Sequence, residues 1–212
     1  MATSTAVIAI LVALMLGAMS PGPSFVLVAR NSVGLSRADG LATAVGMGVG
    51  GVIFGGIALA GLYTLLTSVE WLYITLKIAG GVYLLYLAYK IWRGANSPLV
   101  VDDGAILHRK GVQRSFWLGL TTQLSNPKTA IVYGSIFASL LPQHPPLWCY
   151  IALPPLMFAI EAGWYTLVAI CFSSRRPREI YLRSKKWVDR LASTAIAALG
   201  LRLILTAHKT GL

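Results

Sequence analysis

The sequence predicts an all-α, polytopic membrane protein with six transmembrane helices. Hydrophobic residues make up 56% of the 212 residues and charged residues only 12%, which leaves more apolar surface than one soluble core can bury. The apolar residues gather in six long stretches, and a helix needs about 20 such residues to cross ~30 Å of hydrocarbon. All but one of the tryptophans lie near the ends of these stretches, where an amphipathic ring prefers the membrane interface.

The six stretches give the predicted spans in chain order. We place them at about residues 5–29, 41–66, 71–92, 116–140, 147–172 and 187–207. The loop after the third span divides the chain into halves at about 1–95 and 114–212, joined by a linker at about 96–113. Two halves of three helices each would have opposite orientations in the membrane, which is a known plan of transporters. We therefore expect a 3+3 inverted repeat within a single transmembrane domain, residues 1–212.

The first predicted span is interrupted by the sequence SPGPSF at residues 20–25. The span differs from a secretion signal, because no basic segment precedes it and it exceeds the roughly 7 to 15 apolar residues of a signal peptide. We interpret it as a retained helix. Two prolines around a glycine would break an ordinary helix, because proline lacks an N–H and clashes with the preceding turn.

The second and third spans carry features that we interpret first as packing. Gly46 and Gly50, and Gly51 and Gly55, have the small-xxx-small spacing that lets helix backbones approach closely. Such contacts can form within the chain or between copies in a homo-oligomer, and the alternative is that the glycines leave room for a substrate path. Lys77 is close enough to the outer edge of the third span for its ammonium to reach water, so we assign it a structural role.

The fourth span has a matching interruption, SNPKTA, at residues 125–130. We interpret both interruptions as helix starts, with Ser20 or Asn126 as the N-cap and Pro21 or Pro127 at the first helical position. A helix that begins inside the membrane directs unpaired N–H groups inward, and these attract an anion such as a substrate carboxylate. The alternative is that both are proline kinks that help the helices pack.

The fifth span contains Glu161, about 14 residues from its start and too deep to reach either surface. A carboxylate buried in hydrocarbon usually faces a cavity, a partner or a proton path. Trp164 and Tyr165 share its helix face and are placed to hold a substrate ammonium by cation–π contact. Lys128 is equally deep in the fourth span, where it either pairs with Glu161 or meets a substrate carboxylate. The alternative for both charges is a purely structural pairing.

The formal net charge of +11 indicates membrane topology rather than nucleic-acid binding. Lys and Arg gather in the connections after the first, third and fifth spans, and the connections after the second and fourth carry neither. By the positive-inside rule, both termini lie outside the cytoplasm, which in a bacterium is the periplasm. The basic stretch 175–190 is also placed to contact anionic lipid headgroups.

The sequence lacks the motifs of several other function classes. His108, His144 and His208 all fall outside the predicted spans, so a Ser-His dyad, a metal cluster or an H-E-x-x-H site would have no histidine at depth. No P-loop is present, so a gradient must supply the energy for transport. We expect no enzyme activity, no cofactor and no bound metal. A carrier for cations or metal ions and a structural subunit of a larger complex stay open as alternatives.

Four segments resemble the LysE/RhtB family of amino-acid exporters, and the threonine and homoserine efflux branch is most similar. They are MSPGPSFVLVARNSVG (19–34), LKIAGGVYLLYLAYKIWRGA (76–95), LSNPKTAIVYGSIF (124–137) and KWVDRLASTAIAALGLRLIL (186–205). The resemblance implies a secondary carrier of the bacterial inner membrane that expels amino acids in exchange for protons. Its signature positions fall on Pro21, Gly22, Pro23, Asn126, Pro127 and Lys128.

Two departures from the family pattern affect the expected site. Many relatives carry Asp or Asn where this chain has Ser24, and some carry an acid where it has Gly51, which directs the proton-coupling role to Glu161. We expect a small neutral amino acid such as threonine or homoserine to bind at the two interruptions. The expected substrate-binding residues are Ser20, Pro21, Gly22, Pro23, Ser24, Asn126, Pro127, Lys128, Trp164 and Tyr165.

Overall fold

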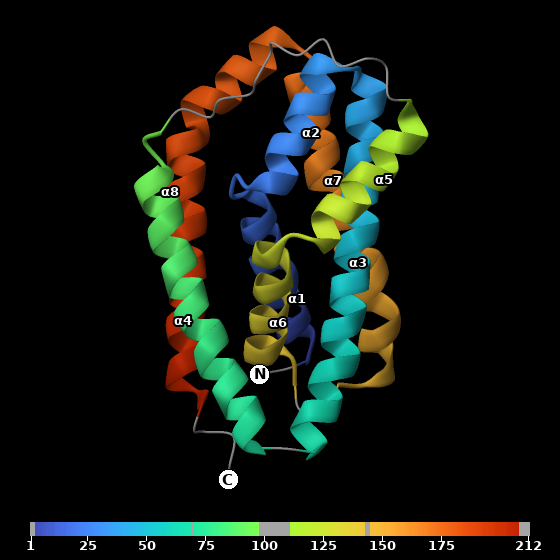
Figure 1. Ribbon diagram of the computed structural model, residues 1–212. Helices are drawn as coiled ribbons and strands as arrows, with labels where there is room; N and C mark the ends of the chain where they lie inside the picture. Colours follow the sequence, from blue (N-terminus) through green and yellow to red (C-terminus); the bar gives the residue numbers. More distant parts are fainter. Residues whose placement is uncertain (1–2, 69, 98–110, 143–144, 208–212) are drawn as a thin grey trace.

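The structure, a computed structural model, describes residues 3–68, 70–97, 111–142 and 145–207, with side chains left out at 61–68, 70–73, 76 and 77. These residues form eight α-helices, so the predicted all-α fold class is confirmed. The helices run mainly along one long axis (Figure 1). They are α1 Thr3–Met19, α2 Pro23–Gly34, α3 Arg37–Ser68, α4 Glu70–Gly94, α5 Val112–Leu124, α6 Pro127–Leu140, α7 Leu147–Phe172 and α8 Arg175–Leu205.

The first and fourth predicted spans are each broken into two helices, as their prolines predict. The axes of α1 and α2 differ by 58° across the first break, and α5 gives way to α6 across the second. Both breaks lie near mid-height of the molecule (Figure 1). The second, third and fifth predicted spans lie within α3, α4 and α7, and the sixth falls on α8, which ends two residues before the predicted end. Most of the predicted linker, and the side chain of Lys77, lie outside the described residues.

Helix length and composition support a polytopic membrane protein. Among the described residues, α3 over Arg37–Ala60 and all of α7 are long and apolar enough to cross a membrane alone, and the bent α1–α2 pair is a third span if it is counted as one. Helices α5 and α6 are shorter, with 13 and 14 residues, and α8 begins with a run of basic residues. Large apolar side chains are exposed on the outside of the bundle, as expected of a surface in contact with lipid. They include Ile8, Ile57, Ile151, Leu167 and Leu191.

The two helix starts at the breaks differ from each other. Asn126 caps α6 as predicted, and its Oδ1 accepts a hydrogen bond from the backbone N of Lys128 at 3.1 Å. At the first break the predicted start is wrong by two residues, since Gly22 is the N-cap and Pro23 takes the first helical position. The cause is the second proline, because a residue that precedes proline is kept out of helical conformation. Gly22 is accordingly extended, with φ −156° and ψ −171°.

The glycines of α3 allow it to pack closely against α5 and α7, which confirms the predicted packing role within the chain. A Cβ at Gly46 would collide with the backbone of Phe116 on α5. A Cβ at Gly50 would lie 2.8 Å from the Gln123 side chain, and one at Gly51 would lie 2.8 Å from Cγ of Glu161 on α7. The small residues therefore let α3 approach both α5 and α7 closely and leave room for the two polar side chains.

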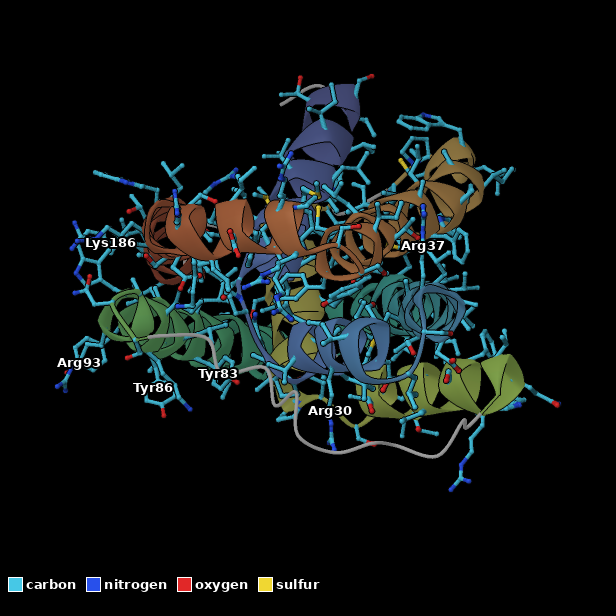
Figure 2. All side chains as sticks on the ribbon, turned by 90° about the horizontal axis from the view of Figure 1, so that it is seen from above. Arg30, Arg37, Tyr83, Tyr86, Arg93 and Lys186 are labelled. Atoms are coloured by element: carbon cyan, nitrogen blue, oxygen red, sulfur yellow. The ribbon has the colours of Figure 1, made fainter. Side chains whose placement is uncertain are left out.

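Most of the described Arg and Lys residues lie toward one end of the molecule, with Lys128 and Arg202 as exceptions. Figure 2 looks down on this end, and the labelled side chains of Arg30, Arg37, Arg93 and Lys186 are spread around it. The first turn of α1 and the last turn of α8 lie at the opposite end (Figure 1). The first part of α8 slopes across the basic end before the helix turns along the bundle (Figure 1). We call this end of the molecule the basic end.

Candidate functional site

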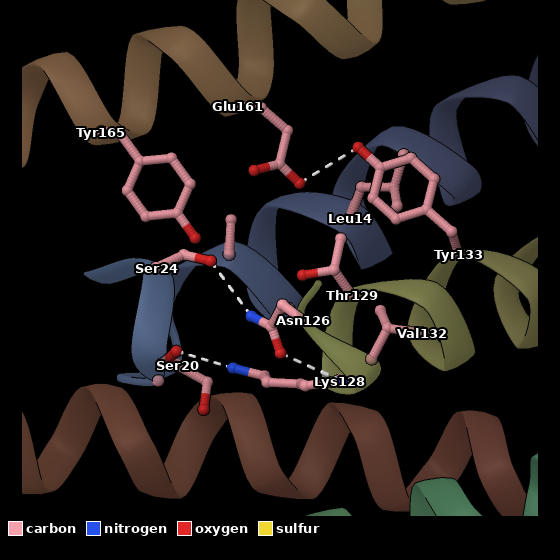
Figure 3. Close-up of a pocket in the computed structure, with 13 residues that line it drawn as sticks. Leu14, Ser20, Ser24, Asn126, Lys128, Thr129, Val132, Tyr133, Glu161 and Tyr165 are labelled. Carbon is pink, nitrogen blue, oxygen red and sulfur yellow. Dashed lines mark hydrogen bonds between the residues drawn. The ribbon is translucent and has the colours of Figure 1, made fainter. Parts of the chain in front are cut away.

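A small polar cavity lies where the two breaks meet (Figure 3). Its volume is about 20 Å³, which is room for about one water molecule. Apolar clusters adjoin it on both sides, because Leu14 and Tyr133 belong to one cluster and Ala18 and Tyr165 to the other. We call it the inner cavity. Its polar lining residues are Ser20, Ser24, Asn126, Lys128, Thr129, Tyr133, Glu161 and Tyr165.

Glu161 is the buried acid of the inner cavity. Its residue is only 3% exposed, and α7 places its carboxylate where two donors can reach it. Tyr133 on α6 donates to Oε1 at 3.0 Å, and Gln123 on α5 donates to Oε2 at 3.3 Å. A buried carboxylate needs such donors, because leaving it without hydrogen bonds is strongly unfavourable.

Hydrogen bonds join the two breaks across the inner cavity. Ser24, in the first turn of α2, donates from Oγ to Oε1 of Gln123 at 2.7 Å. The same hydroxyl accepts from Nδ2 of Asn126, the N-cap of α6, at 3.0 Å. Tyr165 directs its hydroxyl toward Ser24 (Figure 3). The starts of α2 and α6 are therefore held together by a chain of polar side chains that ends at Glu161.

Lys128 is the cation of the inner cavity, on the wall opposite Glu161 (Figure 3). Its Nζ donates to the main-chain oxygen of Ser20 at 2.7 Å. Ser20 follows the last turn of α1, where the helix dipole favours a positive charge. The ammonium does not reach Glu161: among the described residues, the ion pairs within 4.0 Å are Arg175–Glu179 and Lys185–Asp189.

This arrangement places an acid and a base on facing walls, with two helix N-termini between them. An ammonium fits the carboxylate of Glu161, and a carboxylate fits Lys128 and the N–H groups that open α2 and α6. Both charges of an amino acid are therefore matched. A cavity that holds about one water is too small for an amino acid, so the described conformation is closed around this site.

A second and larger cleft lies against the same breaks, and we call it the vestibule. Its volume is about 440 Å³. It shares Ser20, Gly22, Asn126 and Lys128 with the inner cavity. Its other walls come from α4 and α8. Its lining residues Lys90, Gly94 and Ser97, at and just beyond the end of α4, bring it to the basic end.

The structure brings most of the expected substrate-binding residues together. Ser20, Gly22, Ser24, Asn126, Lys128 and Tyr165 line the inner cavity with Glu161. The prolines Pro21, Pro23 and Pro127 line the vestibule instead. Trp164 lines neither, because it is buried in the apolar cluster around Phe25 and Met47. The Trp164 ring therefore faces neither of these two cavities, and the expected cation–π contact with a substrate there is not supported.

Three polar residues in or beside the inner cavity escaped the sequence interpretation. Thr129 and Tyr133 line it, and Gln123 contacts its acid, Glu161. Gln123 donates to Glu161 and accepts from Ser24, so it links the acid to the first break. Its signal in the sequence was its place three residues before Asn126, deep in an apolar span. Tyr133 is 2% exposed. The clue to it was a phenol hydroxyl about two helical turns from either end of α6, where water cannot reach it to form a hydrogen bond.

A metal ion is usually held by several ligand side chains close together. Within the described residues, no three His, Cys, Asp or Glu side chains gather closely enough to hold one. The ion pairs within 4.0 Å among these residues each join a basic side chain to a single carboxylate, Arg175 to Glu179 and Lys185 to Asp189.

The chain is similar to known membrane proteins over most of its length. The sequence pattern of the LysE type translocator family matches residues 15–207. The threonine efflux protein of Escherichia coli K12 is 33% identical over 191 residues, which covers 89% of this chain and 92% of that protein. The threonine efflux protein of Salmonella typhi is 33% identical over 194 residues, with the same coverage. An uncharacterized membrane protein of E. coli K12, YahN, is 29% identical over 185 residues, or 87% of this chain and 82% of that protein. No solved structure matches the chain.

Proposed function

Since the chain belongs to the LysE type translocator family and is a transporter rather than an enzyme, we propose that it exports a small neutral amino acid such as threonine or homoserine. The observation that carries this proposal is the pair of facing breaks, which enclose Glu161 and Lys128 on opposite walls of one cavity. The name of the E. coli and Salmonella relatives, threonine efflux protein, supports the choice of substrate.

The substrate would bind at the breaks by its two charges. Its carboxylate would take the place beside Lys128 and the first N–H groups of α2 and α6, and its ammonium would reach Glu161. Tyr165 and Ser24 lie between these ends. Their hydroxyls would accept a hydrogen bond from a side-chain hydroxyl of the substrate, or donate one to it. The hydrogen bonds between Ser24, Gln123 and Asn126 would have to part for the inner cavity to widen.

Export would be driven by protons that compete with the substrate for Glu161. A carboxylate that holds a proton is neutral and no longer attracts an ammonium, whereas the ionised carboxylate binds one. The proton and the substrate would therefore occupy Glu161 in turn, once on each side of the membrane. Alternating occupancy of one carboxylate yields antiport, and in a bacterium the inward proton gradient would expel the amino acid.

The proposed topology has six spans in a 3+3 inverted repeat, with both termini in the periplasm. The order of elements supports it: each half would comprise a broken pair, α1–α2 or α5–α6, followed by two long helices. The corresponding long helices of the two halves pack together, α3 with α7 and α4 with α8. The separation of the basic end from the described ends of the chain supports the orientation (Figures 1 and 2).

Counterflow in proteoliposomes tests the proposed function. Vesicles loaded with unlabelled threonine should take up labelled threonine from outside, and an excess of homoserine should compete. Larger neutral, acidic and basic amino acids and divalent metal ions form the rest of the competition panel. Competition by metal ions and none by amino acids would replace the proposal with a cation carrier. If protein that is monodisperse and helical takes up none of these solutes, both the amino-acid exporter and the cation carrier are excluded.

A further inference from the structure

The vestibule contains a buried acid that the proposed inner site does not use. Asp189 on α8 lines it and is 3% exposed. Its Oδ2 accepts a 2.7 Å hydrogen bond and ion pair from Lys185, one helical turn earlier. Lys185 also donates to the main-chain oxygen of Gly94, at the end of α4, at 3.1 Å. The Lys185 ammonium is thus shared between the acid and α4.

The other carboxylate oxygen of Asp189, Oδ1, takes no part in the ion pair with Lys185. Among the described residues Oδ1 is fully buried and has no hydrogen-bond partner. Leaving a buried acceptor without a donor is unfavourable, and more so when it is charged, so a structural ion pair alone does not explain this oxygen. Ser20 has the same property: its Oγ is buried and lacks a partner in the described part of the chain. Its hydroxyl points toward α8 (Figure 3).

Lys128 stands between the vestibule and the inner cavity. It lines both, and its charge is attracted by two carboxylates, Glu161 on one side and Asp189 on the other. The two cavities therefore have the same plan: one buried acid, the shared Lys128, and the polar groups of the breaks.

We propose that the vestibule is a second, outer binding site for the substrate amino acid, in which Oδ1 of Asp189 binds the ammonium and Lys128 binds the carboxylate. The inference rests on the proposed function. The substrate would enter from the basic end, bind between Asp189 and Lys128, and pass to Glu161 when the breaks open. Its carboxylate would stay with Lys128 while its ammonium changes from one acid to the other.

The charge balance of the vestibule fits a zwitterion and not a free cation. Three lysines, Lys90, Lys128 and Lys185, line it with the single acid Asp189. The excess positive charge repels metal ions and attracts a carboxylate. The one acid then selects ligands that also carry an ammonium. A volume of about 440 Å³ lies within the usual size of small-molecule sites.

Transport measured from each side of the membrane separately tests the outer site. Inside-out vesicles present threonine to the basic end, and right-side-out vesicles present it to the other end. In Asp189→Asn we expect the KM for threonine to rise at least about tenfold in inside-out vesicles and to stay unchanged in right-side-out vesicles. The matched control is Glu179→Gln, an exposed acid on the same helix, which should leave both KM values unchanged.

The double variant Lys185→Met/Asp189→Leu keeps the test valid if Asp189→Asn folds poorly. It removes both buried charges together, which proteins often tolerate. If Asp189 serves only to neutralise Lys185, this variant restores the wild-type KM in inside-out vesicles, and the outer site is refuted. If Asp189 binds substrate, the raised KM persists. If the wild-type protein takes up threonine and Asp189→Asn has the same KM, the outer site alone is overturned. If the wild-type protein takes up no amino acid, the proposed function is overturned.

Discussion

Lys128 donates a hydrogen bond of 2.7 Å from Nζ to the main-chain oxygen of Ser20, and this bond ties the second broken helix pair to the first. Both residues line the inner cavity and the vestibule, so the bond lies in the wall that separates them. A solute can pass from one to the other only if this contact moves. The cation that would bind the substrate carboxylate is thus the same group that holds the two breaks together.

Replacing Lys128 should therefore abolish substrate binding and loosen the breaks. We expect Lys128→Met to lower kcat/KM for threonine counterflow by at least about a hundredfold, because a charge-assisted hydrogen bond and the binding cation are lost together. Lys186→Met, which removes an exposed lysine on α8, is the matched control and should keep wild-type kinetics. Wild-type counterflow by Lys128→Met would remove this lysine from the site.

Glu161→Gln should abolish uptake of threonine driven by a pH gradient in inside-out vesicles. The amide neither ionises nor binds an ammonium, so it can carry neither the proton nor the substrate charge. It keeps the shape of the side chain and can still bond Tyr133 and Gln123, so the fold should persist, as checked by size-exclusion chromatography. The control is again Glu179→Gln. If Glu161→Gln takes up threonine at the wild-type rate under the pH gradient, this acid takes no part in proton coupling.

The sequence predicted the breaks and the buried charges, because proline and membrane depth act locally. It predicted the start of α6 at Asn126 correctly and misplaced the start of α2, where the second proline moves the N-cap to Gly22. The partners of Glu161 could not be predicted, since Gln123 and Tyr133 reach it from other helices through three-dimensional packing. Asp189 was missed for a different reason: it lies among basic residues near the start of a predicted span, where an acid is ordinarily hydrated.

Ser24 and Gln123 should be energetically coupled. Each single change, Ser24→Ala or Gln123→Ala, leaves a buried polar group of the other residue without its partner and should destabilise the protein by about 1–3 kcal/mol. The double variant should be less destabilised than the sum, by a coupling energy of about 0.5–2 kcal/mol. Denaturant unfolding of the four proteins in detergent micelles measures the cycle. A coupling energy of zero would mean that the 2.7 Å bond between the breaks does not contribute to stability.

The basic end should face the cytoplasm. In a background with Cys149 and Cys171 changed to alanine, we expect a membrane-impermeant maleimide to label Ser4→Cys in intact bacteria and to label Glu179→Cys only after the cells are opened. Ser4 in the first turn of α1 and Glu179 near the start of α8 are exposed. These two helix starts lie at opposite ends of the molecule (Figure 1), so each residue reports one side. The expectation follows from the clustering of Arg and Lys near Glu179. The reverse labelling pattern would mean that the basic end, and with it the vestibule, faces the periplasm.

Replacing Gly51 should impair transport, although glycine has no side chain that could contact the substrate. A Cβ at this position would lie 2.8 Å from both Cγ of Glu161 and Oη of Tyr133, so Gly51→Ala must displace the acid, its hydrogen-bond donor or helix α3 itself. We expect threonine counterflow to fall at least about tenfold and the thermal unfolding midpoint to drop. Gly56→Ala is the matched control on the same helix, because a Cβ there meets no atom of the described residues within 4 Å. It should retain transport and stabilise α3 slightly, since alanine favours helix over glycine by up to about 1 kcal/mol. Equal activity of the two variants would show that Glu161 and Tyr133 can shift without loss of function, and the geometry around the acid would then not limit transport.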